Sequence, residues 1–366
     1  MQKTFHRQYD LDWIRVIATI GVFLYHCSMF VNPFPWHVKN NVTEAGAVLV
    51  FSLFVGAWIM PVFFAVSGIN ITYTLKKRTF TQYVKERLKR LGIPLLFGVF
   101  ILTPPQIYLE RLANNQFHDS YFSFYPHFFE GVYLDFGGTG NFAFFGLHLW
   151  YLLVLLIFSL LAFPLFKIGK RNVQRIHFVL LPLILFATGF IHTQQLGGWD
   201  LIFYFVLFLY GYFFLSNSAF KQGLQATIKL HIGIALITSI VYITWFMIDY
   251  PHHSALAILF FAVKTLNCWS LLLCIFYLAD KYLTDSNRFL TYGREASLPF
   301  YILHQPIILT IGYFIRNFEW GIPTKLIFLI TVSFVVIMLC YHFVIRQVPA
   351  LRFLFGMKRI HLRSGD

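Results

Sequence analysis

The sequence has little charge for its length. Only 12% of its 366 residues are charged, whereas a soluble domain has about 25%. Acidic residues are the scarcer kind, with 15 Asp and Glu against 29 Lys and Arg. Because 58% of the chain is hydrophobic and the apolar runs are long, a soluble globular protein is excluded. The composition predicts an all-α, polytopic integral membrane protein.

Cysteine is also scarce, and its spacing excludes two kinds of site. The chain has four cysteines, all within apolar segments: Cys27, Cys268, Cys274 and Cys340. They form no C-x-x-C pair, so neither a zinc site nor a disulfide framework is predicted. His252 and His253 adjoin in a short loop, but no third ligand accompanies them. We therefore expect no metal site and assign the cysteines to packing.

Ten apolar segments are long enough to be interpreted as membrane spans within a single domain, residues 1–366. Their approximate ranges are 11–30, 46–74, 91–108, 146–166, 177–193, 198–216, 230–249, 255–278, 296–316 and 323–346. The first is interrupted by Asp12 and Arg15, and no small-x-small site follows it. It is therefore predicted to be a retained helix rather than a cleaved signal peptide.

The basic residues predict the orientation of these spans. With the N-terminus in the cytoplasm, most of the 29 Lys and Arg residues fall on the inner side, as the positive-inside rule requires. Arg15 and Lys264 lie inside spans, and the outer side receives only Lys39, Arg111, Arg316 and Lys325. Both termini are then cytoplasmic. The same rule accounts for the net charge of +14, so we expect no nucleic-acid partner.

Three other segments have patterns that bear on function. The outer loop 109–145 is rich in aromatic residues and carboxylates, which suits either a sugar-binding loop or a plain connector. The inner segment 76–90 is predicted to be a basic surface helix. The third span contains Pro94 and Pro104, and the prolines predict either a kink or irregular backbone beside a cavity.

Arg15 and His26, two polar side chains that are unfavourable in lipid, share one face of the first span. A charged group at mid-bilayer costs roughly 2.5–3.5 kcal/mol on insertion scales, so such groups are usually paired or functional. Arg15 and His26 are eleven residues apart, which is about three helical turns, or about 16 Å. Arg15 lies near the inner end, where it could also extend to the interface. His26, a titratable side chain, lies deeper.

Further polar side chains accompany this pair. Arg87 and Arg90 are three residues apart at the inner start of the third span, close to one helical face, and two guanidinium groups can grip phosphate oxygens. The other candidates within spans are Ser67, His148, Trp150 and His304. Each of these alone would be interpreted as a packing or hydrogen-bonding residue.

Taken together, these motifs resemble the membrane acyltransferase 3 family. Arg15 and His26 match the family's arginine-x10-histidine signature, and Arg87-Leu-Lys-Arg90 matches its arginine-x-x-arginine segment. Further matches are Ser67-Gly68, His148-Leu-Trp150 and the segment Ser297-Leu-Pro-Phe-Tyr-Ile-Leu-His304. The opening segment before Arg15 most resembles the branch of the periplasmic-glucan succinyltransferases.

The resemblance implies an acyl-CoA-dependent O-acyltransferase of the bacterial inner membrane. An acetyl or succinyl group would pass from cytoplasmic acyl-CoA to a hydroxyl of a glycan, a glycolipid or another cell-envelope acceptor. Acyl-CoA would be a substrate, and no cofactor would be permanently bound. Arg15, Arg87 and Arg90 would hold acyl-CoA, with His26 as the general base. Ser67, His148, Trp150 and His304 would shape the pocket or orient His26.

Two other functions remain open at this stage, and the oligomeric state is undetermined. Intramembrane Arg, Lys and His residues beside a proline-broken helix are also typical of transporters for anionic substrates. The chain shows no internal repeat, which counts against a transporter. A haem or quinone protein would need histidine ligands on facing helices, such as His26 with His304.

Overall fold

The structure is entirely helical in the part of the chain that it describes. This computed structural model describes residues 8–75, 78–128, 147–169, 173–191, 200–248 and 255–358, and no strand occurs within these ranges. The α-helices are α1 (Tyr9–Met29), α2 (Ala47–Leu75), α3 (Phe80–Arg87), α4 (Ile93–Phe97), α5 (Thr103–Ala113), α6 (Tyr121–His127), α7 (Trp150–Leu161), α8 (Phe163–Phe166), α9 (His177–Ala187), α10 (Leu201–Tyr210), α11 (Ser218–Ile248), α12 (Ala255–Tyr282), α13 (Arg288–Ile315), α14 (Ile322–Leu339) and α15 (Pro349–Leu354).

Six helical stretches are long and apolar enough to cross a membrane. Within the described ranges they are Ala47–Leu75, Phe80–Ala113, Ser218–Ile248, Ala255–Tyr282, Arg288–Ile315 and Ile322–Ile345. Three shorter apolar stretches are Leu147–Leu161, His177–Phe190 and Leu201–Leu215. The structure therefore confirms an all-helical chain with several candidate spans. Ten spans and the orientation of the termini stay predictions.

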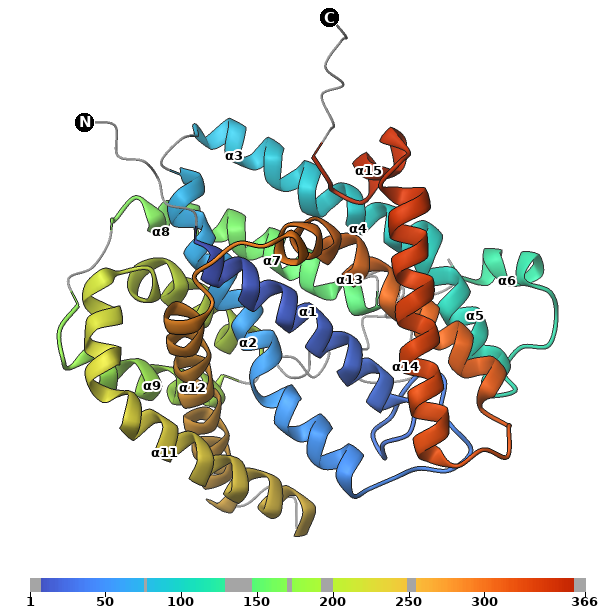
Figure 1. Ribbon diagram of the computed structural model, residues 1–366, viewed down its shortest axis with the longest axis horizontal. Helices are drawn as coiled ribbons and strands as arrows, with labels where there is room; N and C mark the ends of the chain where they lie inside the picture. The colour runs from blue at the N-terminus through green and yellow to red at the C-terminus, as the bar shows by residue number, and fades with distance from the viewer. Residues whose placement is uncertain are drawn as a thin grey trace, which may run out of the picture.

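Helix α1 occupies the centre of the molecule. It packs against α2 and α13 along much of its length, and also against α12 and α14 (Figure 1). Its buried apolar side chains include Ile14, Val22 and Phe23. Asp10 and Asp12 near its start are buried, so these charges face protein rather than lipid.

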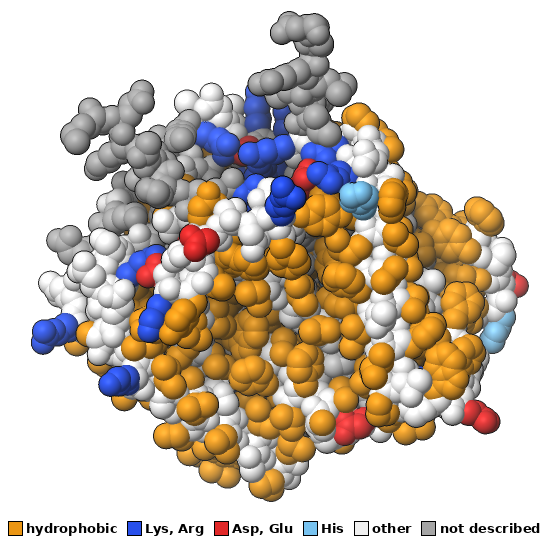
Figure 2. Space-filling view, in the orientation of Figure 1, with side chains coloured by type: hydrophobic (Ala, Val, Ile, Leu, Met, Phe, Trp, Pro, Cys, Tyr) orange, Lys and Arg blue, Asp and Glu red, His pale blue; other side chains and the backbone are white. Residues whose placement is uncertain are grey.

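The exposed surface divides into an apolar body and a basic edge. Figure 2 shows hydrophobic side chains over most of the visible face, while Lys and Arg gather along its upper edge, near α3 and α15 in Figure 1. Large apolar side chains on this body are well exposed, as at Ile240 (68%) and Phe314 (66%). Such a surface is stable in lipid rather than in water.

The predicted basic surface helix is present. Thr79 caps α3 by accepting a hydrogen bond from the Gln82 backbone N–H, and the Gln82 side chain in turn accepts one from Thr79 N–H. Lys85 lies exposed on this helix, and Arg87 ends it half-buried. Residues 76 and 77, at the start of the predicted segment, lie outside the described ranges.

The helix continues through the prolines of the third predicted span, with irregular turns in its backbone. Two π-helical turns, Leu88–Gly92 and Gly98–Leu102, precede α4 and α5, and Pro94 and Pro104 occupy the first turns of these two helices. The π-helical turn before each proline shifts the backbone bonding, with Ile93 N–H donating to the Leu88 carbonyl and Thr103 N–H to the Gly98 carbonyl. Thr103 Oγ1 donates to the Gly98 carbonyl at 3.1 Å. A continuous helical stretch, Phe80–Ala113, results.

Two glycines allow α2 to approach the neighbouring chain closely. Gly68 of α2 lies against the Phe208 carbonyl of α10, and Gly211, the first residue of the π-helical turn Gly211–Leu215, lies against the Ala65 carbonyl of α2. A Cβ at either position would overlap the facing carbonyl oxygen. Small residues at helix crossings let backbones meet in this way. Gly68 therefore has a packing role beside the predicted site residue Ser67.

The remaining polar and cysteine residues follow ordinary packing rules. Lys264, the predicted intramembrane lysine of α12, is paired with Asp200 at 3.3 Å. All four cysteines are free, and Cys27, Cys268 and Cys274 are buried. The absence of disulfides among them agrees with the sequence prediction.

Candidate functional site

Arg15 is paired through Asp12, one turn earlier on α1. Its Nη1 lies 3.3 Å from Asp12 Oδ1, and Asp12 Oδ2 lies 3.3 Å from Nη1 of Arg294, on α13. One carboxylate thus holds two guanidinium groups side by side. The Arg15 and Arg294 side chains remain 33% and 27% exposed, so both keep donors free for a ligand. The sequence reasoning did not select Arg294, which lies far from Asp12 along the chain.

Arg87 and Arg15 both lie near enough to a buried tyrosine to act on it electrostatically. Both guanidinium groups lie within electrostatic range of the Tyr151 hydroxyl, which forms a 2.8 Å hydrogen bond with Ser67 Oγ. The Arg87 guanidinium also stacks over the Tyr83 ring, with 5.1 Å to the centroid. The structure therefore places Ser67 in contact with the Tyr151 hydroxyl, with Arg15 and Arg87, from two other segments, within electrostatic range.

Arg90 lies beside this group, on altered helix geometry. Arg87 ends α3, whereas Arg90 belongs to the π-helical turn Leu88–Gly92, so the pair does not sit on one regular α-helix as expected. A π-helix has more residues per turn than an α-helix. The angle around the helix axis between two residues three apart is therefore different. Arg90 still interacts electrostatically with Arg87, and its Nε lies 3.4 Å from a Glu86 carboxylate oxygen.

Three histidines meet about three turns along α1 from Arg15. His26 Nδ1 lies 2.6 Å from His304 Nε2, and the two rings are stacked with centroids 4.8 Å apart. The His148 ring packs edge-on against His304 at 5.0 Å. His304 and His148 are 1% and 5% exposed, whereas His26 is only half-buried. Of the three, His26 is the one that a substrate can reach.

The backbone assigns the protons of this cluster. His304 Nδ1 lies 2.5 Å from the Tyr301 carbonyl oxygen, which can only accept, so Nδ1 carries the proton and Nε2 is the acceptor. His26 Nδ1 must then donate to His304 Nε2, and His26 Nε2 keeps a free lone pair. His148 Nε2 likewise donates to the Ile302 carbonyl at 3.0 Å. With all rings neutral, His26 therefore presents a basic nitrogen.

Tyrosines connect the arginine group with the histidine cluster. The Tyr151 ring lies 6.0 Å from that of Tyr301, and the Tyr301 ring lies 5.5 Å from that of His304. The Tyr301 hydroxyl donates to the His148 carbonyl. Tyr301 was not selected from the sequence, although its position three residues before His304 in one helix was a usable signal.

Comparison with known proteins identifies the family of this chain. A family model described as an acyltransferase domain, that of acyltransferase 3, matches residues 8–342. The chain belongs to the acyltransferase 3 family. The matched range contains all eight predicted site residues and the two that the structure adds, Arg294 and Tyr301.

This acyltransferase also resembles curated proteins over nearly its full length. It is 26% identical over 385 residues to the glucans biosynthesis protein C of Salmonella paratyphi B, covering 96% of this chain and 95% of the relative. The protein of the same name from Escherichia coli O139:H28 is 25% identical over 409 residues, covering 98% of this chain and 97% of the relative. No solved structure matches.

Trp150, which follows His148 closely in the chain, has ring contacts on a different set of residues. Its indole packs against Phe64 of α2, with centroids 6.1 Å apart, and against Tyr204 of α10 at 5.9 Å. Since Phe64 in turn contacts Tyr151 at 5.1 Å, Trp150 contributes to the packing around the Tyr151 hydroxyl. The role of Trp150 in shaping the pocket stays a prediction.

The histidine cluster of the acyltransferase does not have the geometry of a metal or haem site. With metal–nitrogen bonds of about 2.0–2.1 Å, two nitrogens that share an ion lie about 3.3 Å apart at a tetrahedral zinc and about 4 Å apart on opposite sides of a haem iron. His26 and His304 are instead in direct hydrogen-bonding contact. No group of three potential ligands occurs in the part of the chain that the structure covers. His252 and His253 lie outside that part, as does most of the loop 109–145 beyond residue 128.

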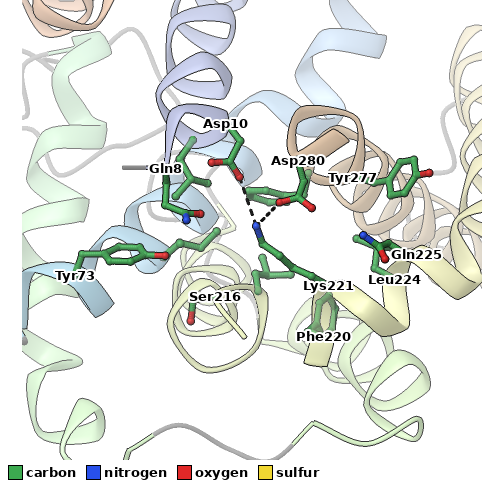
Figure 3. A pocket seen from close by; sticks show the side chains of 14 residues that line it. Gln8, Asp10, Tyr73, Ser216, Phe220, Lys221, Leu224, Gln225, Tyr277 and Asp280 are labelled. Carbon is green, nitrogen blue, oxygen red and sulfur yellow. Dashed lines mark hydrogen bonds and ion pairs between the residues drawn. The ribbon is translucent and has the colours of Figure 1, made fainter. Parts of the chain in front are cut away.

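A separate pocket opens beside the start of α1. Figure 3 shows Lys221 of α11 reaching toward two carboxylates, with Nζ 2.5 Å from Asp280 Oδ1 and 3.6 Å from Asp10 Oδ2. Tyr73, Phe276 and other apolar side chains line the rest. No predicted site residue takes part. The ion pairs join α1, α11 and α12, so we assign this pocket to helix packing rather than to catalysis.

Proposed function

We propose that this acyltransferase moves an acetyl or succinyl group from acyl-CoA to a hydroxyl of a glycan or another cell-envelope acceptor. The observation that carries the proposal is the connected row of side chains from Arg15 and Arg87, through Tyr151 and Tyr301, to the histidine pair. One end of this row suits a polyanion, and the other end provides a base.

The arginine end matches the chemistry of coenzyme A. Its phosphates would bind Arg15, Arg87 and Arg90, with Arg294 as a fourth donor group, because guanidinium groups bind phosphate oxygens in bidentate fashion. Arg15 and His26 lie about 16 Å apart along α1, at about 1.5 Å per residue. An extended pantetheine arm, thin and largely apolar, suits a path of this kind along a helix and beside the tyrosine rings.

The histidine end suits proton transfer during attack on a thioester. His26 Nε2 would accept the proton of the acceptor hydroxyl while its oxygen bonds to the thioester carbon. The carbon–sulfur bond then breaks, and the departing CoA thiolate takes the proton back from His26. His304 would hold His26 in the required tautomer through the 2.6 Å contact, so His304 is a positioning residue.

The acceptor class rests on the comparisons. The relatives that this chain matches over almost its whole length are named for glucan biosynthesis. Family membership supports acyl transfer, and the relatives' name supports a glucan as the acceptor. We therefore infer that the acceptor hydroxyl belongs to a glucan of the cell envelope.

We further propose that the basic edge faces the cytoplasm of a bacterial inner membrane. A cysteine introduced by Glu319→Cys, beyond α13, should react with an impermeant maleimide applied from outside intact spheroplasts. A cysteine introduced by Lys358→Cys, beyond α15, should react only after permeabilisation. Both positions are exposed. Labelling in the opposite order would contradict the orientation.

The donor site is tested at Arg15. Arg15→Gln should raise the KM for acyl-CoA about 10–100-fold, because a hydrogen bond to a charged group contributes about 1.5–3 kcal/mol. The measurement is steady-state transfer by purified protein in liposomes, with CoA release followed by thiol titration. Arg288→Gln is the matched control, since Arg288 is an exposed arginine at the start of α13.

An unchanged acyl-CoA KM in Arg15→Gln would contradict the donor site, provided that Arg288→Gln also behaves as wild type. Uptake of an anionic substrate by liposomes that contain no acyl-CoA would contradict the whole proposal and favour a transporter.

A further inference from the structure

The segment between α1 and α2 is held in place by two lysines. Lys39 Nζ donates to the carbonyls of Met29 at 2.8 Å and Phe34 at 3.0 Å, and also to that of Asn32. Burial lowers the pKa of Lys39 to about 8, so at pH 7 its ammonium group is still charged and keeps three donors. This segment, residues 30–46, is therefore pinned to the end of α1, where His26 lies.

Lys325 of α14 fixes the same segment from the other side. It is 1% exposed, and its Nζ donates to the side-chain oxygens of Asn40 at 2.7 Å and Asn41 at 3.1 Å. A third bond runs to the Arg316 carbonyl at 2.9 Å. A buried charge with three acceptors is costly to disturb. The loop consequently presents its side chains to His26 in one arrangement.

Trp36 is the loop residue that reaches His26. The two ring centroids lie 5.0 Å apart. The indole Nε1 of Trp36 is buried and makes no hydrogen bond within the described residues. Buried indole N–H groups usually have a partner, because an unmade hydrogen bond costs free energy. A donor without a partner, next to the proposed base, points to a ligand that supplies the acceptor.

His37 and Glu110 extend this surface away from Arg15. The ring of His37 lies 5.0 Å from that of Trp36, and His37 Nδ1 is 2.6 Å from Glu110 Oε2, near the end of α5. The two side chains are 22% and 18% exposed. Glu110 Oε1 makes no hydrogen bond among the described residues, so this oxygen is an available acceptor next to His37.

We propose that Trp36, His37 and Glu110 form the subsite that binds the acceptor sugar and chooses which of its hydroxyls faces His26. The inference rests on the proposed function. Trp36 would pack on the apolar face of a sugar ring and donate its N–H to a ring substituent. The His37–Glu110 pair would bind a second hydroxyl, with Glu110 Oε1 as acceptor.

The chemistry of these groups favours a neutral carbohydrate. A sugar ring offers both apolar C–H faces and hydroxyls that donate and accept, which matches an aromatic platform with one donor and one acceptor. Glu110 would repel an anionic acceptor.

The subsite can be tested by measuring sugar binding in the absence of acyl transfer. Saturation-transfer NMR with a glucose hexasaccharide and the full-length protein in detergent should detect binding. Trp36→Phe, which keeps an aromatic ring but loses the indole N–H, and Glu110→Gln, which keeps the size but loses the charge, should each weaken it about tenfold. The same variants should raise the acceptor KM and shift the acylated position, read by mass spectrometry. Their affinity for CoA should not change.

Matched controls lie at the same edge of the molecule. Trp320→Phe and Glu319→Gln remove the same groups from exposed positions and should bind the hexasaccharide as wild type does. Wild-type binding in both Trp36→Phe and Glu110→Gln would overturn the subsite, as would tighter binding of an acidic oligosaccharide. Hexasaccharide binding without transfer from acyl-CoA would instead reject the proposed function and leave the sugar site supported.

Discussion

His26→Ala is expected to lower acyl transfer about 10²–10⁴-fold, which is the usual contribution of a positioned general base. The loss should appear in kcat, because His26 acts on the acceptor proton while acyl-CoA is held at the arginine end. Transfer is measured with purified protein in liposomes, using radiolabelled acyl-CoA and a glucose oligosaccharide. Binding of CoA should remain within about twofold of wild type.

Two controls separate catalysis from folding in this variant. His177→Ala removes a histidine at the start of α9, outside the histidine cluster, and should leave transfer unchanged. The melting temperature of His26→Ala should fall only slightly, because one hydrogen bond to His304 is lost. Near-normal transfer by His26→Ala would show that His26 is not the base and that the cluster has another role.

Gly68→Ala should destabilise the protein by about 3 kcal/mol or more, at the upper end of the range for overpacked sites. The added methyl group would overlap the Phe208 carbonyl, which is backbone and cannot rotate away. Helices α2 and α10 would have to separate, and the displaced residues would include Ser67, which binds Tyr151. Thermal unfolding in detergent, followed by circular dichroism, measures the effect.

Gly233→Ala is the matched control for this prediction. Gly233 lies in α11, and a Cβ there would meet no atom within 4 Å. Alanine has the better helix propensity, by about 0.8–1.0 kcal/mol, so this variant should unfold at the same temperature as wild type or higher. Equal melting temperatures for Gly68→Ala and wild type would show that α2 and α10 do not cross so closely.

Much of α1 was predictable from the sequence. The spacing of Arg15 and His26 predicts one helical face, and in the structure the two residues act in groups connected by side chains along that face. The reason is local: an α-helix repeats every 3.6 residues whatever it packs against. The capped surface helix α3 was predictable for the same reason, from Thr79 through Gln82 to its basic residues.

The prediction for the third span shows where local rules end. The prolines predicted either a kink or irregular backbone in this span. The structure has two π-helical turns there, and the helical stretch continues through them. Which solution a chain adopts depends on the helices that surround it, since only they can compensate for altered hydrogen bonds. The angular relation of Arg87 to Arg90 changed with it, because Arg90 lies in one of these turns.

The membrane class, the helical face that carries Arg15 and His26, and the motifs of the acyltransferase 3 family all follow from the order of the amino acids. The contact partners of these residues follow only from how the helices pack. His26 meets His304 across 278 residues, Asp12 meets Arg294 across 282, and Trp36 reaches His26 from a loop pinned by Lys325. Helical periodicity is set within four residues, whereas contacts between helices depend on how all the buried faces pack together.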